Sequence, residues 1–158
     1  MDIESREAVP FPKLNLPMAE LPISKSEGKW HVFDPLRKKY LILSPEEWVR
    51  QHIIYYLWKH KAYPKGLFIV ERGLLYNRLQ KRLDILVQDR KGAPFLLVEC
   101  KAPTVKLSQS TLEQVCMYNR EIGARYLAIS NGMKHVCLEF SIKTGSFMPM
   151  KSFPDFSL

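Results

Sequence analysis

Two short apolar runs separated by a polar stretch mark the middle of the chain. The first, Leu83–Val87, is apolar apart from Asp84, and the second, Phe95–Lys101, is apolar until its last three residues. Short aliphatic and β-branched runs bounded by turn residues favour strands over helix. The pattern predicts a β-hairpin whose turn centres on Lys91-Gly92.

The charged side chains of this hairpin are predicted to converge. Side chains alternate along a strand, so Glu99 and Lys101 emerge on one face, and the antiparallel register sets Asp84 opposite Glu99. Cross-strand partners lie roughly 4.5–5.5 Å apart at Cβ. Two interpretations remain open. One is a functional cluster at a buried sheet end, where unpaired charge is costly. The other is ordinary pairing at a solvated end, with Asp84 facing Arg82 or Lys81.

A first helix is predicted from the polar signals before an apolar stripe. Ser44 is the expected N-cap and Glu47 the N3 residue of a capping box. Val49–Leu57 carries apolar residues at helical spacing, and extending this stripe backward reaches Glu46. Glu46 is therefore expected on the face toward the sheet, with an ion pair to Arg50 as its alternative role.

A second helix is predicted over Thr111–Ile122, capped at Ser110 and closed by Gly123. Gln114 and Tyr118 are four residues apart and are expected to share a face. The ordinary interpretation of such a glutamine is a satisfied buried amide.

The remaining apolar runs predict further strands over residues 29–33, 39–43, 67–70, 125–130 and 134–140. The strand that follows the second helix is expected to run parallel to the second arm of the hairpin. A two-residue turn at Asn131-Gly132 then joins it to the next strand. The order of elements predicts an α/β fold, a mixed sheet of five or more strands flanked by helices in three layers.

The organisation expected is a single domain over residues 28–150. Residues 1–27 contain four prolines and predict an extended arm, and residues 151–158 form a short tail. At 158 residues the chain can bury a core. No apolar run approaches the ~20 residues of a membrane span, so a cytoplasmic location is expected.

The formal charge is +8, from 24 Lys and Arg against 16 Asp and Glu. Such an excess favours polyanionic partners but is also common on solubilising surfaces. Neither the four histidines nor the three cysteines form a zinc-binding pattern. The basic side chains expected to contact nucleic acid are Arg37, Lys38, Lys81, Arg82, Arg90 and Lys91.

An Asp followed, after a hairpin, by Glu-x-Lys resembles the PD-(D/E)xK nuclease superfamily, with the restriction-endonuclease-like fold. The chain is particularly similar to the N-terminal nuclease domain of type I restriction enzyme R subunits. Leu83 stands where the superfamily motif has proline. The matching blocks are DPLRKKYLILSPEEWVRQ (34–51), KRLDILV (81–87), LLVECKAP (96–103), EQVCMYN (113–119) and SNG (130–132).

The resemblance implies a Mg²⁺-dependent endonuclease, with Mn²⁺ as a substitute and DNA as the expected substrate. It implies Asp84, Glu99 and the Cys100 backbone carbonyl as metal ligands and Lys101 as a catalytic residue. A glutamate of the first helix joins the metal site in this family, and Glu46 is preferred to Glu47. Two further residues, Gln114 and Tyr118, match a Gln-x-x-x-Tyr motif that supports the centre.

Two other functions are consistent with the same sequence. One is a nucleic-acid-binding module without catalysis, and the other is an accessory subunit of a restriction or repair assembly. The chain lacks the G-x-x-x-x-G-K-S/T pattern of an ATP-driven motor. A homodimer is possible, because two strands of a duplex must be cut, and a larger complex is the alternative.

Overall fold

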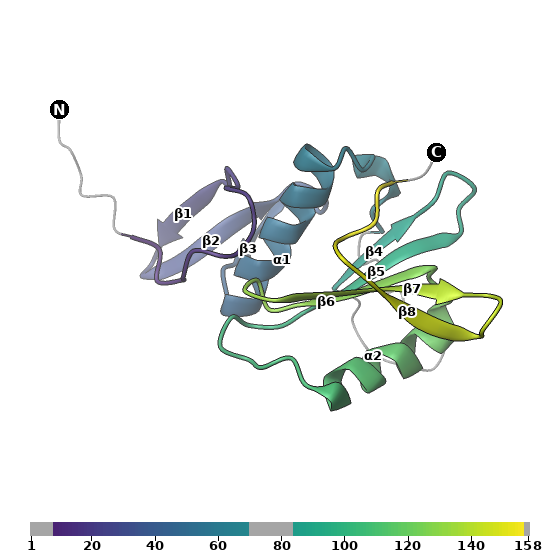
Figure 1. Ribbon diagram of the computed structural model, residues 1–158. Helices are drawn as coiled ribbons and strands as arrows, with labels where there is room; N and C mark the ends of the chain where they lie inside the picture. Colours follow the sequence, from purple (N-terminus) through teal and green to yellow (C-terminus); the bar gives the residue numbers. More distant parts are fainter. Residues whose placement is uncertain (1–7, 70–83, 157–158) are drawn as a thin grey trace.

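The predicted hairpin lies inside a five-stranded sheet. The computed structural model describes residues 8–69 and 84–156. The sheet has the order β4-β5-β6-β7-β8, in which β5 and β6 are parallel and every other pair is antiparallel (Figure 1). The predicted mixed sheet and the parallel crossover are both confirmed. Its strands are β4 (Ile85–Gln88), β5 (Pro94–Cys100), β6 (Tyr126–Ser130), β7 (His135–Ser141) and β8 (Ser146–Met150).

One helix covers each face of this sheet. On one face, α1 (Pro45–Tyr55), continued by a π-helical turn over Tyr56–His60, shares an apolar cluster with Ile85 and Val98. On the other, α2 (Gln109–Ile122) shares a second cluster with Leu97. Successive strand residues alternate between the two clusters, as the period of a strand requires. The predicted three-layer α/β core is confirmed.

A smaller antiparallel sheet precedes α1. It consists of β1 (Ile23–Ser26), β2 (Lys29–Asp34) and β3 (Lys39–Ile42), and β1 was not predicted from the sequence. Before β1, the Pro12 carbonyl accepts a hydrogen bond from Trp48 Nε1 at 2.9 Å, and the side chain of Leu14 is buried in the core. Residues 8–27 therefore contribute both a strand and core contacts.

The two helix caps differ in how well the sequence located them. Ser44 Oγ accepts from the Glu47 backbone N–H at 3.1 Å, which confirms the first cap. The second prediction is wrong by two residues, since Ser108 Oγ accepts from the Thr111 N–H at 3.2 Å and α2 begins at Gln109. Ser108 and Ser110 are both good caps, and composition alone does not choose between them.

Three turns and ends depart from the expected pattern. Residues 131–134 form a four-residue turn, not a two-residue one, since Ser130 pairs with His135. Where a strand was predicted over residues 67–70, residues 65–67 form a short 3-10 helix. After it, Phe68 forms a single β-bridge with Val87, and the Ile69 N–H donates to the Leu86 carbonyl. Near the C-terminus, Phe153 is buried and the Pro154 carbonyl accepts from the Tyr63 hydroxyl. In residues 8–69 and 84–156, no helix is long and apolar enough to cross a membrane.

Candidate functional site

Asp84 and Glu99 meet at the end of the central hairpin. Ile85 pairs with Val98, so the residue before β4 stands opposite the last but one residue of β5, as predicted. The Asp84 Oδ2 atom accepts a hydrogen bond from the Cys100 N–H at 2.8 Å. The carboxylate of Asp84 is thereby turned onto the end of β5, beside Glu99.

Lys101 completes a compact charged group. Its Nζ lies 3.5 Å from Glu99 Oε1, and its side chain is 30% exposed whereas that of Glu99 is 8% exposed. By strand alternation these side chains share a face with Leu97, which packs under α2. The Lys101 ammonium therefore lies between the buried Glu99 carboxylate and solvent.

Burial, and then the neighbouring charge of Glu99, raise the pKa of Asp84 to about 7, and the Cys100 hydrogen bond opposes this rise. Two carboxylates held together out of water resist double ionisation, so they retain a proton near neutral pH. A divalent cation would remove this repulsion by replacing the proton. The pair therefore has the electrostatic character of a cation site.

The donor set fits Mg²⁺ better than a softer metal. In residues 8–69 and 84–156, no group of three or more His, Cys, Asp or Glu side chains gathers as a metal cage. Mg²⁺ is commonly bound through one or two carboxylates, with waters and substrate phosphate as its other ligands. Asp84, Glu99 and the Cys100 backbone carbonyl are the oxygen donors that this arrangement would use.

The first-helix glutamates are placed differently from the expectation. Glu46 is exposed, so the expected orientation of its side chain toward the sheet is wrong. Glu47 Oε1 instead lies 2.7 Å from Arg50 Nη1 and 2.9 Å from Gln51 Nε2. The backward extension of the apolar stripe failed because Arg50 and Gln51 are themselves buried and draw Glu47 inward.

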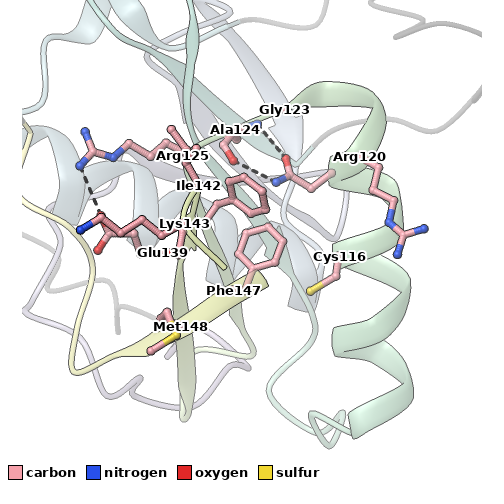
Figure 2. Close-up of a pocket in the computed structure, with 13 residues that line it drawn as sticks. Cys116, Arg120, Gly123, Ala124, Arg125, Glu139, Ile142, Lys143, Phe147 and Met148 are labelled. Atoms are coloured by element: carbon pink, nitrogen blue, oxygen red, sulfur yellow. Dashed lines mark hydrogen bonds and ion pairs between the residues drawn. The ribbon is translucent and has the colours of Figure 1, made fainter. Parts of the chain in front are cut away.

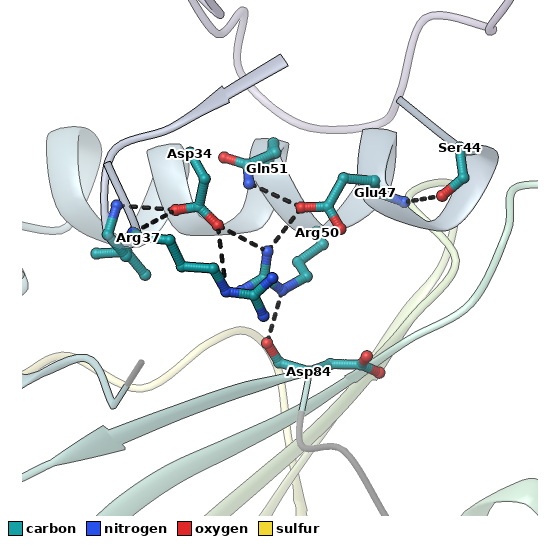
Figure 3. A network of polar contacts seen from close by, with 8 residues as sticks. Asp34, Arg37, Ser44, Glu47, Arg50, Gln51 and Asp84 are labelled. Carbon is teal, nitrogen blue, oxygen red and sulfur yellow. Dashed lines mark hydrogen bonds and ion pairs between the residues drawn. The ribbon is translucent and has the colours of Figure 1, made fainter. Parts of the chain in front are cut away.

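Asp34 and Arg50 anchor this region, and neither was predicted from the sequence as a residue of the site (Figure 3). Arg50 Nη1 lies 3.2 Å from Asp34 Oδ2, and Arg50 Nε donates to the Asp84 backbone carbonyl at 2.8 Å. Burial alone lowers the pKa of Arg50, but Glu47 and Asp34 raise it overall, so the guanidinium stays charged. The sequence signal that could have identified Arg50 is its position directly after Val49, a core residue of α1.

Tyr118 lies close to the carboxylates, whereas Gln114 is exposed. Burial raises the pKa of the Tyr118 hydroxyl, and the charges of Glu99 and Asp84 raise it further. The hydroxyl is therefore a neutral donor on the α2 side of the site. Gln114, one turn earlier on α2, is an exposed residue, so it is not the buried structural amide that the ordinary interpretation expects.

The family described as the type I restriction enzyme R protein N terminus matches residues 45–154. The chain belongs to this family. The matched segment includes α1, the central hairpin, α2 and the strands after it, and it excludes the sheet of β1, β2 and β3. No curated protein matches the chain closely.

The basic residues expected to bind nucleic acid are dispersed in this member of the R protein N-terminal family. Arg37 is largely buried and lies 3.9 Å from Asp34, while the adjacent Lys38 is exposed in the β2–β3 turn. Arg90 and Lys91 are exposed in the β4–β5 turn, at the end of the hairpin opposite Asp84. Lys81 and Arg82 lie outside the described residues.

A cavity of about 950 Å³ lies elsewhere in this R protein N-terminal domain, between α2 and the β7–β8 hairpin (Figure 2). Its lining includes Cys116, Arg120, Ile142, Phe147 and Met148, and neither carboxylate of the pair contributes to it. This cavity is therefore separate from the charged group of Asp84, Glu99 and Lys101.

Proposed function

We propose that this chain is a Mg²⁺-dependent nuclease that hydrolyses phosphodiester bonds in DNA. The observation that carries the proposal is the opposed Asp84–Glu99 pair with the Lys101 ammonium 3.5 Å from Glu99. Membership of the type I restriction enzyme R protein N-terminal family supports it. Mn²⁺ is expected to substitute for Mg²⁺, since both prefer oxygen ligands.

Each residue has a role that follows from its place. Asp84, Glu99 and the Cys100 carbonyl would hold the ion, and Mg²⁺ when bound supplies a Lewis acid that activates water and offsets charge on the phosphate. Lys101, partly exposed beside Glu99, is placed to stabilise negative charge that develops on the phosphate oxygens. The neutral Tyr118 hydroxyl is a supporting hydrogen-bond donor.

The direct test is cleavage of plasmid and linear duplex DNA by the purified protein with Mg²⁺ or Mn²⁺. Asp84→Asn and Glu99→Gln should lower both metal affinity and turnover, the latter by at least ~100-fold, because each removes a charged ligand. Lys101→Ala should bind Mn²⁺ like the wild type but turn over at least ~100-fold more slowly. The matched control is Glu113→Gln, an exposed carboxylate of α2.

The competing functions predict different outcomes. A non-catalytic DNA-binding module would bind duplex DNA without metal-dependent nicking. An accessory subunit would cut only when its assembly partners are added. Equal cutting by the wild type in EDTA and in Mg²⁺ would contradict the proposed site, and an unchanged rate for Lys101→Ala would contradict the role of the lysine.

A further inference from the structure

A buried arginine joins the small N-terminal sheet to the carboxylate pair (Figure 3). The guanidinium of Arg50 contacts Asp34 from β2, Glu47 from α1 and the backbone carbonyl of Asp84, at 3.2, 2.7 and 2.8 Å. Arg50 is 8% exposed and Asp34 is fully buried. A buried cation with two carboxylate partners is committed to them, so Arg50 does not serve as a phosphate contact.

Asp84 is consequently held at both of its polar groups. Its carbonyl accepts from Arg50 Nε on the α1 side, and its carboxylate accepts from the Cys100 N–H, each at 2.8 Å. In Figure 3 the carboxylate of Asp84 points away from the guanidinium while the carbonyl faces it. Because Asp84 precedes the first residue of β4, the Arg50 contact fixes its backbone where the strand ladder has not yet begun.

The side chain of Asp34 is held in place by backbone N–H groups of the β2–β3 turn. Its Oδ1 accepts from the Leu36 and Arg37 N–H groups at 2.8 and 3.2 Å, which leaves Oδ2 for Arg50. Burial by itself raises the pKa of Asp34, but Arg50 and these two N–H groups hold it below its ordinary value. The turn therefore presents a fixed anion to the guanidinium.

We propose that Arg50, oriented by Asp34, is a positioning residue that holds the Asp84 carboxylate opposite Glu99. This inference rests on the proposed nuclease function, and it makes the β1–β3 sheet part of the site. Asp34 lies before the segment that matches the R protein N-terminal family, which begins at residue 45. Asp34, at the start of the β2–β3 turn, is linked to the central hairpin by its salt bridge to Arg50 and by the hydrogen bond from Arg50 to the Asp84 carbonyl.

Two variants isolate this role. Arg50→Lys keeps the charge but loses the planar fork that serves a carboxylate and a carbonyl together. Asp34→Asn keeps the turn acceptor and removes the anion. Arg125→Lys is the matched control, because Arg125 lies 3.3 Å from Glu139 in an exposed pair. All measurements are made on the full chain at a temperature where circular dichroism shows each variant to be folded.

The first measurement needs neither metal nor substrate. Amide hydrogen exchange of Cys100 in the metal-free protein should accelerate by about 10-fold in Arg50→Lys, since its acceptor is no longer held in place. Calorimetry should then show Mn²⁺ affinity reduced by about 10–100-fold, as is typical when a partner of a metal ligand is removed. The DNA cleavage rate kcat should fall with KM unchanged within about 2-fold, and high Mn²⁺ should restore part of kcat.

Each result decides the proposal. If Arg50→Lys and Asp34→Asn lower only the melting temperature, and leave Cys100 exchange, Mn²⁺ affinity and kcat as in Arg125→Lys, Arg50 is merely structural and the proposal is overturned. Unfolding of Arg50→Lys leaves the decision to Asp34→Asn, for which the same directions are expected with smaller size. A wild type that neither binds Mn²⁺ nor cuts DNA refutes the nuclease function instead, while Cys100 exchange still tests the hold on Asp84.

Discussion

Neutralising Glu99 should stabilise the metal-free protein. The rise in the pKa of Asp84 from 3.8 to about 7 corresponds to roughly 4 kcal/mol of resistance to ionisation, at ~1.4 kcal/mol per pK unit. Burial is the largest cause of this rise, and Glu99 adds to it both through its charge and through a side-chain hydrogen bond. Glu99→Gln should therefore raise the unfolding free energy at pH 8 in EDTA by about 1–2 kcal/mol.

The dependence of the unfolding free energy on pH gives a second way to measure this destabilisation. A folded-state pKa above the unfolded one means that the folded protein retains a proton between about pH 4 and pH 7, so stability falls as pH rises through that window. Urea unfolding at pH 5 and pH 8 should show this fall in the wild type and a smaller one in Glu99→Gln. Glu113→Gln, an exposed carboxylate, should follow the wild type.

Magnesium should reverse the order of stability, so that the wild type becomes more stable than Glu99→Gln. A ligand at 100 times its Kd stabilises the folded state by about 2.7 kcal/mol, and Glu99→Gln should lose most of this gain. The salt-bridge interpretation predicts the opposite in EDTA, because the variant would strand the Lys101 charge. A Glu99→Gln protein that is less stable than the wild type at pH 8 in EDTA would refute the reasoning.

Three further predictions concern metal and nucleic acid. Cleavage should occur with Mg²⁺ or Mn²⁺ and be slight with Ca²⁺, whose longer and looser coordination activates water poorly; comparable rates in Ca²⁺ would count against the site. Mn²⁺ affinity measured by calorimetry should increase from pH 6 to pH 8, because the proton retained by the Asp84–Glu99 pair must leave before the ion binds; a flat profile would contradict the pairing. DNA affinity should fall steeply with salt, and Lys91→Ala should reduce the slope of log K against log salt by about 1; an unchanged slope would show that this exposed residue contacts no phosphate.

The sequence was sufficient where structure depends on neighbours in the chain. The predicted opposition of Asp84 and Glu99 is found at the open end of the hairpin, where Ile85 pairs with Val98, although a bulge after Val87 shifts the register nearer the turn. The Ser44 cap could be located because a proline and a glutamate follow it at fixed spacing. These are local rules, and each was satisfied by a few consecutive residues.

Contacts across long separations were beyond such rules. Arg50 contacts Asp34 and Asp84 only after three elements have packed together, and no residue spacing in the sequence predicts these contacts. Glu46 and Glu47 are adjacent, so the choice between them depended on which neighbours α1 buries. The second cap failed for a related reason, since two serines compete and tertiary packing selects Ser108.

The edges of the five-stranded sheet bear on how copies of the chain could associate. Along β4, Phe68 and Ile69 already occupy the outer side by pairing with Val87 and Leu86. Along β8, at the other edge, Pro149 has no N–H to offer an incoming strand. Continuous sheet extension from one molecule to the next is therefore disfavoured at both edges, so any association of copies would have to rely on side-chain contacts rather than strand pairing.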